Sequence, residues 1–193
     1  GGLEAYDWII INTSAGKDSQ AMTDYVVELA DRVGIRDRLV MAHADLGRVE
    51  WQGTGDLAKE HAAAYGLRYV VERRTKNDLL EQIEARGMFP DSKNRYCTSD
   101  QKTTPISRLY TRLAKETKEA LKKAGKPPRP AMIISALGIR GQESPARLER
   151  YKQSQFPVEK KTTGKGTVKK VWRWLPIFWW SEDEVWARIK LAG

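Results

Sequence analysis

The sequence contains very little cysteine and no long hydrophobic run, and these two absences narrow the class of protein. Cys97 is the only cysteine among 193 residues, so an internal disulfide is excluded and a reducing cytoplasm is the natural setting. No apolar stretch approaches the roughly 20 residues of a membrane-spanning helix, and the first residues lack the order of a secretory signal. We therefore expect a cytoplasmic globular protein with no membrane partner.

Histidine is also scarce, which bears on metal binding. His43 and His61 are the only two histidines, and they are too far apart and too unaccompanied to indicate a metal site. We expect them to occupy core or helix-surface positions. One cysteine cannot hold an iron–sulfur cluster alone, so we expect no Fe–S cluster in this chain.

Acidic residues are nearly missing from one segment of a chain whose formal net charge is +9. Residues 150–173 contain eight Lys or Arg against one acid, Glu159. Clustered cations release counterions from a phosphate backbone, so nucleic acid is one partner that this segment suggests. The alternative is a solvated, flexible basic insertion at about 151–171, with "TTGKGTVKK" as a hairpin. Five tryptophans accompany the segment, mainly as core residues, although one or two rings could stack on bases: Trp172, Trp174, Trp179, Trp180 and Trp186.

Apolar runs alternate with helical patterns along the chain. The predicted strands cover residues 6–12, 38–45, 67–73 and 131–138, and "VWRWLPIFWW" returns to the core as a fifth. The predicted helices lie at about 18–33, 51–66, 77–87, 105–125, 143–150 and 181–190. This order predicts an α/β fold, a Rossmann-like, doubly wound, mostly parallel five-stranded sheet with helices on both faces. We expect residues 1–193 to form a single nucleotide-binding domain.

Three polar motifs each follow a predicted strand. They are "NTSAGKDS" after the first strand, "HADLG" at the end of the second and "LGIRGQES" after the fourth. In a doubly wound sheet, ligands bind at the carboxyl ends of the strands. The sequence therefore predicts one site at this edge.

The first motif fits an anion site but neither of two well-known phosphate loops. Ile11 and Asp18 occupy positions where a GxxxxGK[ST] loop needs a glycine and a hydroxyl, and the GxGxxG spacing is also missing. Backbone amides at a helix N-terminus, the charge of Lys17 and the hydroxyls of Ser14 and Ser19 remain to hold phosphate. Asp18 would repel phosphates unless a cation lay between, which indicates Mg²⁺ bound through the phosphates. The alternative is a simple helix cap formed by Ser14 or Asp18.

Several of these motifs together resemble one family. "SAGKDS" resembles the SGGxDS signature of the PP-loop ATP pyrophosphatase superfamily, with Ala15 in place of a glycine. "RYCTSDQKTTPI" with Cys97, Lys102 and Pro105, "LGIRGQESPAR" and "WLPIFWWSEDEVWARI" resemble segments of its phosphoadenosine phosphosulfate (PAPS) reductase family, in the family's order.

The resemblance implies an adenine-nucleotide site. Its nucleotide-binding residues would be Ser14, Ala15, Gly16, Lys17, Asp18, Ser19, Asp45, Gly47, Gly138 and Arg140. Lys17 and Asp18 would be catalytic, with ATP and Mg²⁺ as cofactors. Arg95, Lys102 and Arg147 would surround a second anion. The alternative for Arg140 and Arg147 is a surface ion pair, for instance Arg147 with Glu143 at i,i+4.

The family's reactions leave three functions open. The first is ATP cleavage between the α- and β-phosphates with adenylation of a substrate, in sulfur or nucleic-acid modification chemistry. The second is reduction of PAPS or adenylyl sulfate through a C-terminal cysteine segment, which we expect this chain to lack. The third is a non-catalytic nucleotide- or nucleic-acid-binding module. Cys97 is either a reactive thiol beside Arg95 and Lys102 or a small buried residue, and a homo-oligomer is left open.

Overall fold

The fold is built on one six-stranded sheet. The computed structural model describes residues 2–90, 99–161 and 168–192. The strand order is β3-β2-β1-β4-β6-β5, with all neighbours parallel except the antiparallel pair of β5 and β6. The strands are β1 (Trp8–Thr13), β2 (Leu39–Asp45), β3 (Arg68–Arg73), β4 (Ala131–Leu137), β5 (Val158–Lys160) and β6 (Lys169–Trp174). The predicted fold class is confirmed, and the five predicted strands are β1 to β4 and β6.

The sixth strand, β5, lies inside the segment that we expected to be a flexible insertion. Val158 pairs with Trp174 and Lys160 with Trp172, so β5 and β6 form a hairpin at the edge of the sheet. Residues 162–167, which connect them, lie outside the described residues. Part of the basic segment therefore belongs to the sheet, where ladder hydrogen bonds hold its backbone.

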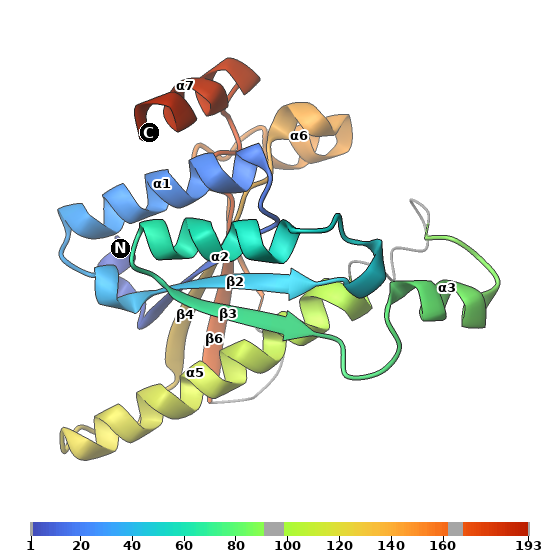
Figure 1. The fold of residues 1–193 in the computed structure, drawn as a ribbon. Helices are drawn as coiled ribbons and strands as arrows, with labels where there is room; N and C mark the ends of the chain where they lie inside the picture. Colours follow the sequence, from blue (N-terminus) through green and yellow to red (C-terminus); the bar gives the residue numbers. More distant parts are fainter. Residues whose placement is uncertain (1, 91–98, 162–167, 193) are drawn as a thin grey trace.

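Helices cover the sheet in layers (Figure 1). Helices α1 (Lys17–Arg32) and α2 (Thr54–Ala64) lie on one face, with α7 (Glu182–Ala192) packed outside α1. Helix α5 (Thr104–Lys123) lies on the other face, while α3 (Leu79–Arg86) and α6 (Pro145–Tyr151) lie near the carboxyl ends of the strands. In the described part of the chain, no helix is both long and apolar enough to cross a membrane.

The central strand β1 separates two cores because its side chains alternate. Ile9 and Ile11 pack with Met22 and Val26 of α1, and Ile10 packs with Leu109 of α5. All six side chains are fully buried. Such a strand, buried on both faces, fixes the position of the loop that follows it.

Capping side chains, a glycine and a proline explain where several helices begin and end. Asp78 and Glu81 form a capping box at the start of α3, and Gly87 ends this helix in the left-handed region with φ of 62°. Pro105 lies in the first turn of α5, where its missing N–H does no harm. Ser181 accepts a hydrogen bond from the Glu184 amide at 3.1 Å, which confirms the predicted cap of α7.

Helix α7 is held firmly against α1. Arg188 forms ion pairs with Asp24 and Glu28 of α1, and the Trp180 and Tyr25 rings lie 5.2 Å apart. These contacts bring the first turn of α7 to the start of α1, beside the loop that follows β1.

Candidate active site

The loop between β1 and α1 has the backbone shape of an anion site. Ala15 has φ of 57°, and it is the one non-glycine residue with positive φ among those described. Its amide donates to Thr13 Oγ1 at 3.0 Å. Gly16 occupies the N-cap of α1 and has no side chain to cap the helix, so amides of the first turn remain available to an anion.

Ser19 organises this loop from within. Its side chain is buried, and its hydroxyl donates to the Gly16 carbonyl at 2.8 Å. The Ser14 amide lies 3.4 Å from the same Oγ, while the Ser14 side chain itself is exposed. Contact of Ser14 and Ser19 with phosphate stays a prediction, and in this arrangement Ser14 is the hydroxyl that faces solvent.

Two cations and two carboxylates meet at the start of α1. Arg140 Nε donates to Asp18 Oδ1 at 2.7 Å, and Lys17 Nζ lies 3.2 Å from Asp18 Oδ2. Lys17 Nζ also lies 3.5 Å from Glu182 Oε1 of α7. The Arg140 side chain is only 7% exposed, whereas that of Glu182 is 58% exposed. The protein itself therefore supplies the cations that neutralise Asp18, a task that the sequence analysis gave to Mg²⁺.

Gly138 brings these groups together by allowing a close backbone approach. A Cβ at this position would lie 3.1 Å from the carbonyl carbon and oxygen of Asp18 and from the amide nitrogen of Ser19. Gly138 thus packs on the first turn of α1, and Arg140 follows two residues later. This contact explains a glycine at the end of β4 without any direct contact to a nucleotide.

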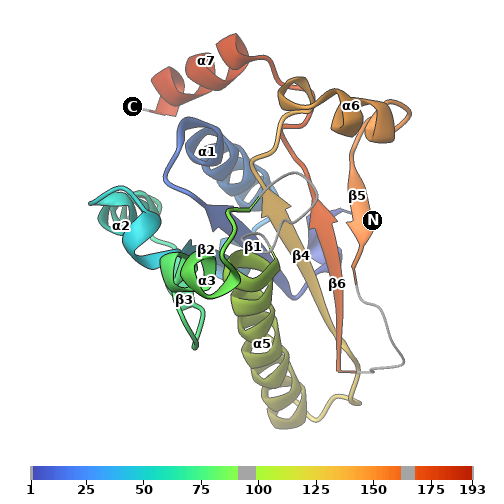
Figure 2. The same cartoon turned by 90° about the vertical axis from the view of Figure 1, so that its right-hand side faces the viewer.

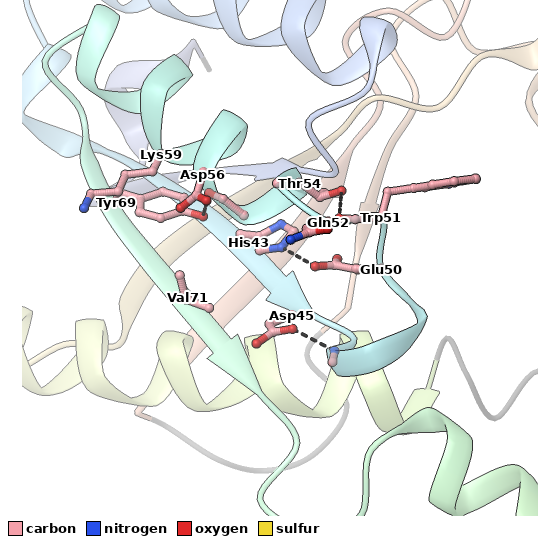
Figure 3. Close-up of a pocket in the computed structure, with 13 residues that line it drawn as sticks. His43, Asp45, Glu50, Trp51, Gln52, Thr54, Asp56, Lys59, Tyr69 and Val71 are labelled. Atoms are coloured by element: carbon pink, nitrogen blue, oxygen red, sulfur yellow. Dashed lines mark hydrogen bonds and ion pairs between the residues drawn. The ribbon is translucent and has the colours of Figure 1, made fainter.

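A cleft opens next to the loop, at the carboxyl ends of β2 and β3 (Figure 3). Its volume is about 380 Å³, and its lining includes Asp45, Glu50, Asp56 and Lys59. Three carboxylates against one ammonium make the cleft acidic, in contrast to the loop with Lys17 and Arg140. The cleft is therefore more acidic than the loop, where two cations face two carboxylates.

The turn after β2 has the tight geometry that a glycine permits. Gly47 has φ of 70°, and its amide donates to Asp45 Oδ1 at 2.7 Å. A Cβ at Gly47 would lie 2.8 Å from Arg73 Nη2 and 3.1 Å from Asp78 Cβ. The turn is also tied to α3, because Arg48 makes two hydrogen bonds to the Asp78 carboxylate at 2.6 and 3.1 Å.

His43 links the cleft to the loop. This buried side chain lies at the end of β2, with Nδ1 3.1 Å from the Thr13 carbonyl oxygen and Nε2 3.0 Å from Glu50 Oε2. Figure 3 shows the contact with Glu50, and it shows the Trp51 ring, 90% exposed, extending away from the other side chains. The expected core position of His43 is confirmed. His61 is half-buried, and burial lowers its pKa.

The residues expected around a second anion are only partly placed by the structure. Lys102 is exposed on the π-helical turn Ser99–Thr103, directly before α5. Arg147 Nη1 lies 3.4 Å from Glu143 Oε2, which is the i,i+4 ion pair that we held open as its alternative. Arg95 and Cys97 lie outside the described residues, so the predictions for the second anion and for the thiol stay predictions.

Two functional candidates were missed by sequence reasoning. Glu182 lies more than 160 residues from Lys17 along the chain, so no local pattern could connect them. Glu50 follows the "HADLG" motif by three residues, but its contact with His43 depends on the turn at Gly47. The signal available for Glu182 was its place in the first turn of a helix, which by itself indicates only a favourable helix dipole.

A comparison of the sequence with models of protein families identifies the chain. The model of the phosphoadenosine phosphosulfate reductase domain matches residues 8–193. The chain belongs to this family. This membership agrees with the resemblance noted in the sequence, and members of the family bind adenine nucleotides as substrates.

Solved structures place the fold of this PAPS reductase family member among known ones. The phosphate complex of PAPS reductase from Candida auris has a TM-score of 0.51 and 16% identity, and the match covers 98% of this chain and 74% of that one. The U34-tRNA thiolase NcsA from Methanococcus maripaludis, solved with its [4Fe-4S] cluster, has a TM-score of 0.44 and 17% identity. That match covers 95% of this chain and 55% of the thiolase. No curated protein matches the sequence. At such low identity, the likeness to the reductase establishes the fold.

The donor set of this family member fits a magnesium ion that arrives with a nucleotide better than a resident one. Among the described residues, no group of three or more His, Cys, Asp or Glu could hold a metal. Both oxygens of Asp18 already face protein cations, Arg140 and Lys17. Mg²⁺ needs only one or two carboxylates when phosphates supply its other ligands. Asp18, which faces Lys17, is the carboxylate that would take that part.

Proposed function

We propose that this PAPS reductase family protein binds ATP in a single nucleotide-binding domain and transfers its adenylyl group to an oxygen-bearing substrate. In this reaction a substrate oxygen attacks the α-phosphorus, the bond from this phosphorus to the oxygen bridging to the β-phosphate breaks, and pyrophosphate leaves with that oxygen. The observation that carries the proposal is the junction of the β1–α1 loop with Arg140. There, open helix amides and two cations converge on one point at the carboxyl edge of the sheet.

The difference in charge between the loop and the more acidic cleft supports one orientation of the nucleotide. Phosphates favour the helix N-terminus with Lys17 and Arg140. Ribose hydroxyls donate hydrogen bonds to carboxylates, and the neighbouring cleft is lined by Asp45, Glu50 and Asp56. We therefore place the triphosphate on the loop and the nucleoside in the cleft, with the Gly47 turn between β2 and α2 beside it.

This arrangement suits a reaction that needs positioning and charge neutralisation more than covalent help. The negative charge grows on the leaving pyrophosphate, and fixed donors aimed at it stabilise the transition state. Lys17 is the more accessible cation of the site, because its side chain is 27% exposed and its ammonium is shared between two carboxylates. Arg140 is the fixed one, because it is buried and bonded to Asp18.

Pyrophosphate release with ATP and Mg²⁺ tests the proposal, with DNA or tRNA offered as acceptors. We expect Lys17→Ala to reduce release at least tenfold. Lys115→Ala, which removes an exposed lysine from α5, serves as the matched control and keeps full release. Equal release by wild type and Lys17→Ala, or none above background with any acceptor, would refute the adenylation reaction.

Family membership supports one second candidate, the reduction of a sulfonucleotide such as PAPS or adenylyl sulfate. The two candidates differ in the nucleotide that the site prefers. A competition experiment with labelled ATP separates them, using adenosine 3′,5′-bisphosphate as the competitor. Displacement of ATP at a concentration well below that of ATP itself would favour the sulfonucleotide, and weak displacement would favour ATP.

A further inference from the structure

The face of the sheet beyond α5 is lined with cations. Residues opposite one another on neighbouring strands share a face, and Arg173 pairs with Ser135 of β4 and with Glu159 of β5. Val171, two residues before Arg173, belongs to the core under α5. Arg173 therefore lies on the α5 side, and so does Lys169, whose Nζ donates to Thr111 Oγ1 of α5 at 2.6 Å.

We call this surface the basic face. It consists of one residue of α6, one of β5, the residue directly after β5 and two of β6: Arg150, Glu159, Lys161, Lys169 and Arg173. Figure 2 shows α5 in front of the middle of the sheet; β6 packs against it in part, through Val171 and Lys169, and β5 lies beyond it. Sheets built from parallel strands normally bury both faces under helices. Charged side chains on this part of the sheet allow it to face solvent without a covering helix.

One carboxylate organises the cations of the basic face. Glu159 forms ion pairs with Arg150 at 2.6 Å, Lys161 at 2.5 Å and Arg173 at 4.0 Å. The Tyr151 hydroxyl also donates a hydrogen bond to this carboxylate at 2.5 Å. Burial raises the pKa of Glu159, but Lys161, Tyr151 and Arg150 outweigh this and lower the pKa to about 2. The carboxylate is thus outnumbered by cations that stay accessible, since the side chain of Arg150 is 62% exposed and that of Arg173 is 36% exposed.

Protection of an edge strand explains only part of this pattern. Lysines on an edge such as β5 prevent pairing with other chains. Arg173 and Lys169, however, belong to β6, which has a neighbour on each side, and Arg150 comes from a helix. Their convergence on one face calls for a polyanion as the partner.

The basic face is connected to the candidate active site through β4. Ser135, beside Arg173, accepts a hydrogen bond at 2.7 Å from Asn12 Nδ2 at the end of β1, just before the β1–α1 loop. Along β6, Lys169 and Arg173 are about 13 Å apart at the usual rise per residue, which spans a few successive phosphates of an extended strand. At the upper end of the hairpin, Phe156 is 68% exposed and Trp179 is 43% exposed, and exposed rings of this kind stack on bases.

We propose that the basic face binds the phosphate backbone of a single-stranded nucleic acid and directs it toward the β1–α1 loop. Cations in a row and exposed aromatic rings are the two features by which proteins hold single strands. The role of this strand as the acceptor rests on the proposed function. The binding itself does not, because it needs no nucleotide.

Fluorescence anisotropy with labelled single-stranded RNA and DNA of about 16 nucleotides tests the binding over a series of salt concentrations. We expect the wild type to bind with a steep salt dependence. In the triple variant Lys161→Gln, Lys169→Gln, Arg173→Gln, the slope of log K against log salt should fall by about 2, at about 0.7 per lost phosphate contact. Glu159→Gln removes the competing carboxylate and should tighten binding severalfold.

A second triple variant controls for net charge. Arg32→Gln, Arg36→Gln, Lys190→Gln removes the same charge from exposed positions at the end of α1, just after it and on α7, which cover the other face of the sheet, and should bind like the wild type. Equal loss of affinity in both triple variants, or a wild-type slope near zero, would overturn the proposal, as would binding of duplex DNA in preference to single strands. Circular dichroism confirms that each variant is folded. Because ATP is left out, failure of adenylation and failure of strand binding appear as separate results.

Discussion

Gly138 offers a direct test of how the two halves of the candidate site are joined. In Gly138→Ala the new Cβ would lie 3.1 Å from three backbone atoms of Asp18 and Ser19. Backbone atoms in the first turn of a helix cannot rotate away, so the end of β4 and the start of α1 must separate by a few tenths of an ångström. Overpacking of this kind typically costs about 1–3 kcal/mol.

The expected result has two parts, one in stability and one in binding. A chain of this length loses about 2–4 °C in Tm per kcal/mol, so Tm should fall by about 2–12 °C. The same shift moves Arg140 away from Asp18, which it contacts at 2.7 Å, and should weaken the binding of ATP. Thermal unfolding and isothermal titration calorimetry measure the two effects on the same preparation.

Gly55→Ala is the matched control for this substitution. Gly55 lies in the first turn of α2, and a Cβ there would meet nothing within 4 Å. Alanine should therefore stabilise the protein by about 0.4–1 kcal/mol through the unfolded state. Because Gly55 lines the cleft, it is a control for stability alone. If Gly138→Ala matched Gly55→Ala in stability and bound ATP like the wild type, the close packing of β4 on α1 would not be what holds the site together.

Four further substitutions at three positions probe the β1–α1 loop, the contact of Glu182 with Lys17 and the link between α3 and the turn after β2. Ala15→Gly should change the free energy of unfolding by less than about 1 kcal/mol, because relief at φ of 57° is offset by a freer unfolded chain, whereas Ala15→Val should lower it by about 1–3 kcal/mol in urea unfolding. Glu182→Gln should raise the affinity for ATP in calorimetry by up to about fivefold, because an exposed ion pair with Lys17 is worth about 0.2–1 kcal/mol; weaker binding would instead make Glu182 part of the nucleotide site. Asp78 should stabilise the fold at neutral pH, because hydrogen bonds from Arg48 and the Glu81 amide lower its pKa from 3.8 to about 2, and this contribution should fade as the pH falls from about 4 toward 2. The wild type and Asp78→Asn, which keeps the cap but loses the charge, should therefore converge in unfolding free energy at acid pH, and a constant difference would contradict the ion pair.

The central parallel strands β1, β2 and β4 could be predicted because each contains an uninterrupted apolar run. The run at residues 8–11 is buried on both faces, and burial of this kind leaves a signal that needs no knowledge of neighbours. Strand β5 left no such signal, because Val158–Lys160 holds one apolar residue followed by two charged ones. It is a strand because β6 offers it a partner, and pairing of this kind depends on tertiary structure.

The candidate site, like the sheet, could be predicted from the sequence only in part. Its position could be predicted, because polar motifs at the ends of parallel strands must meet at one edge. The pairing within it could not, since the sequence showed Asp18 beside Lys17 but gave no sign that the Arg140 side chain reaches Asp18 Oδ1. A carboxylate in need of a cation was recognised from the sequence, while the source of that cation depended on the approach of β4 that Gly138 allows.

The two carboxylates that contact Lys17 have different parts to play when a phosphate arrives. Asp18 is fixed on α1 and bonded to a buried guanidinium, so releasing it would leave Arg140 as an unpaired buried charge, which is strongly unfavourable. Glu182 is exposed and holds Lys17 at 3.5 Å, where solvent weakens the attraction. A phosphate oxygen should therefore replace Glu182 as the partner of Lys17 and leave the Asp18 pair intact. The site then exchanges one surface contact for a charged ligand, and the lysine needs to move only from one side of the helix end to the other.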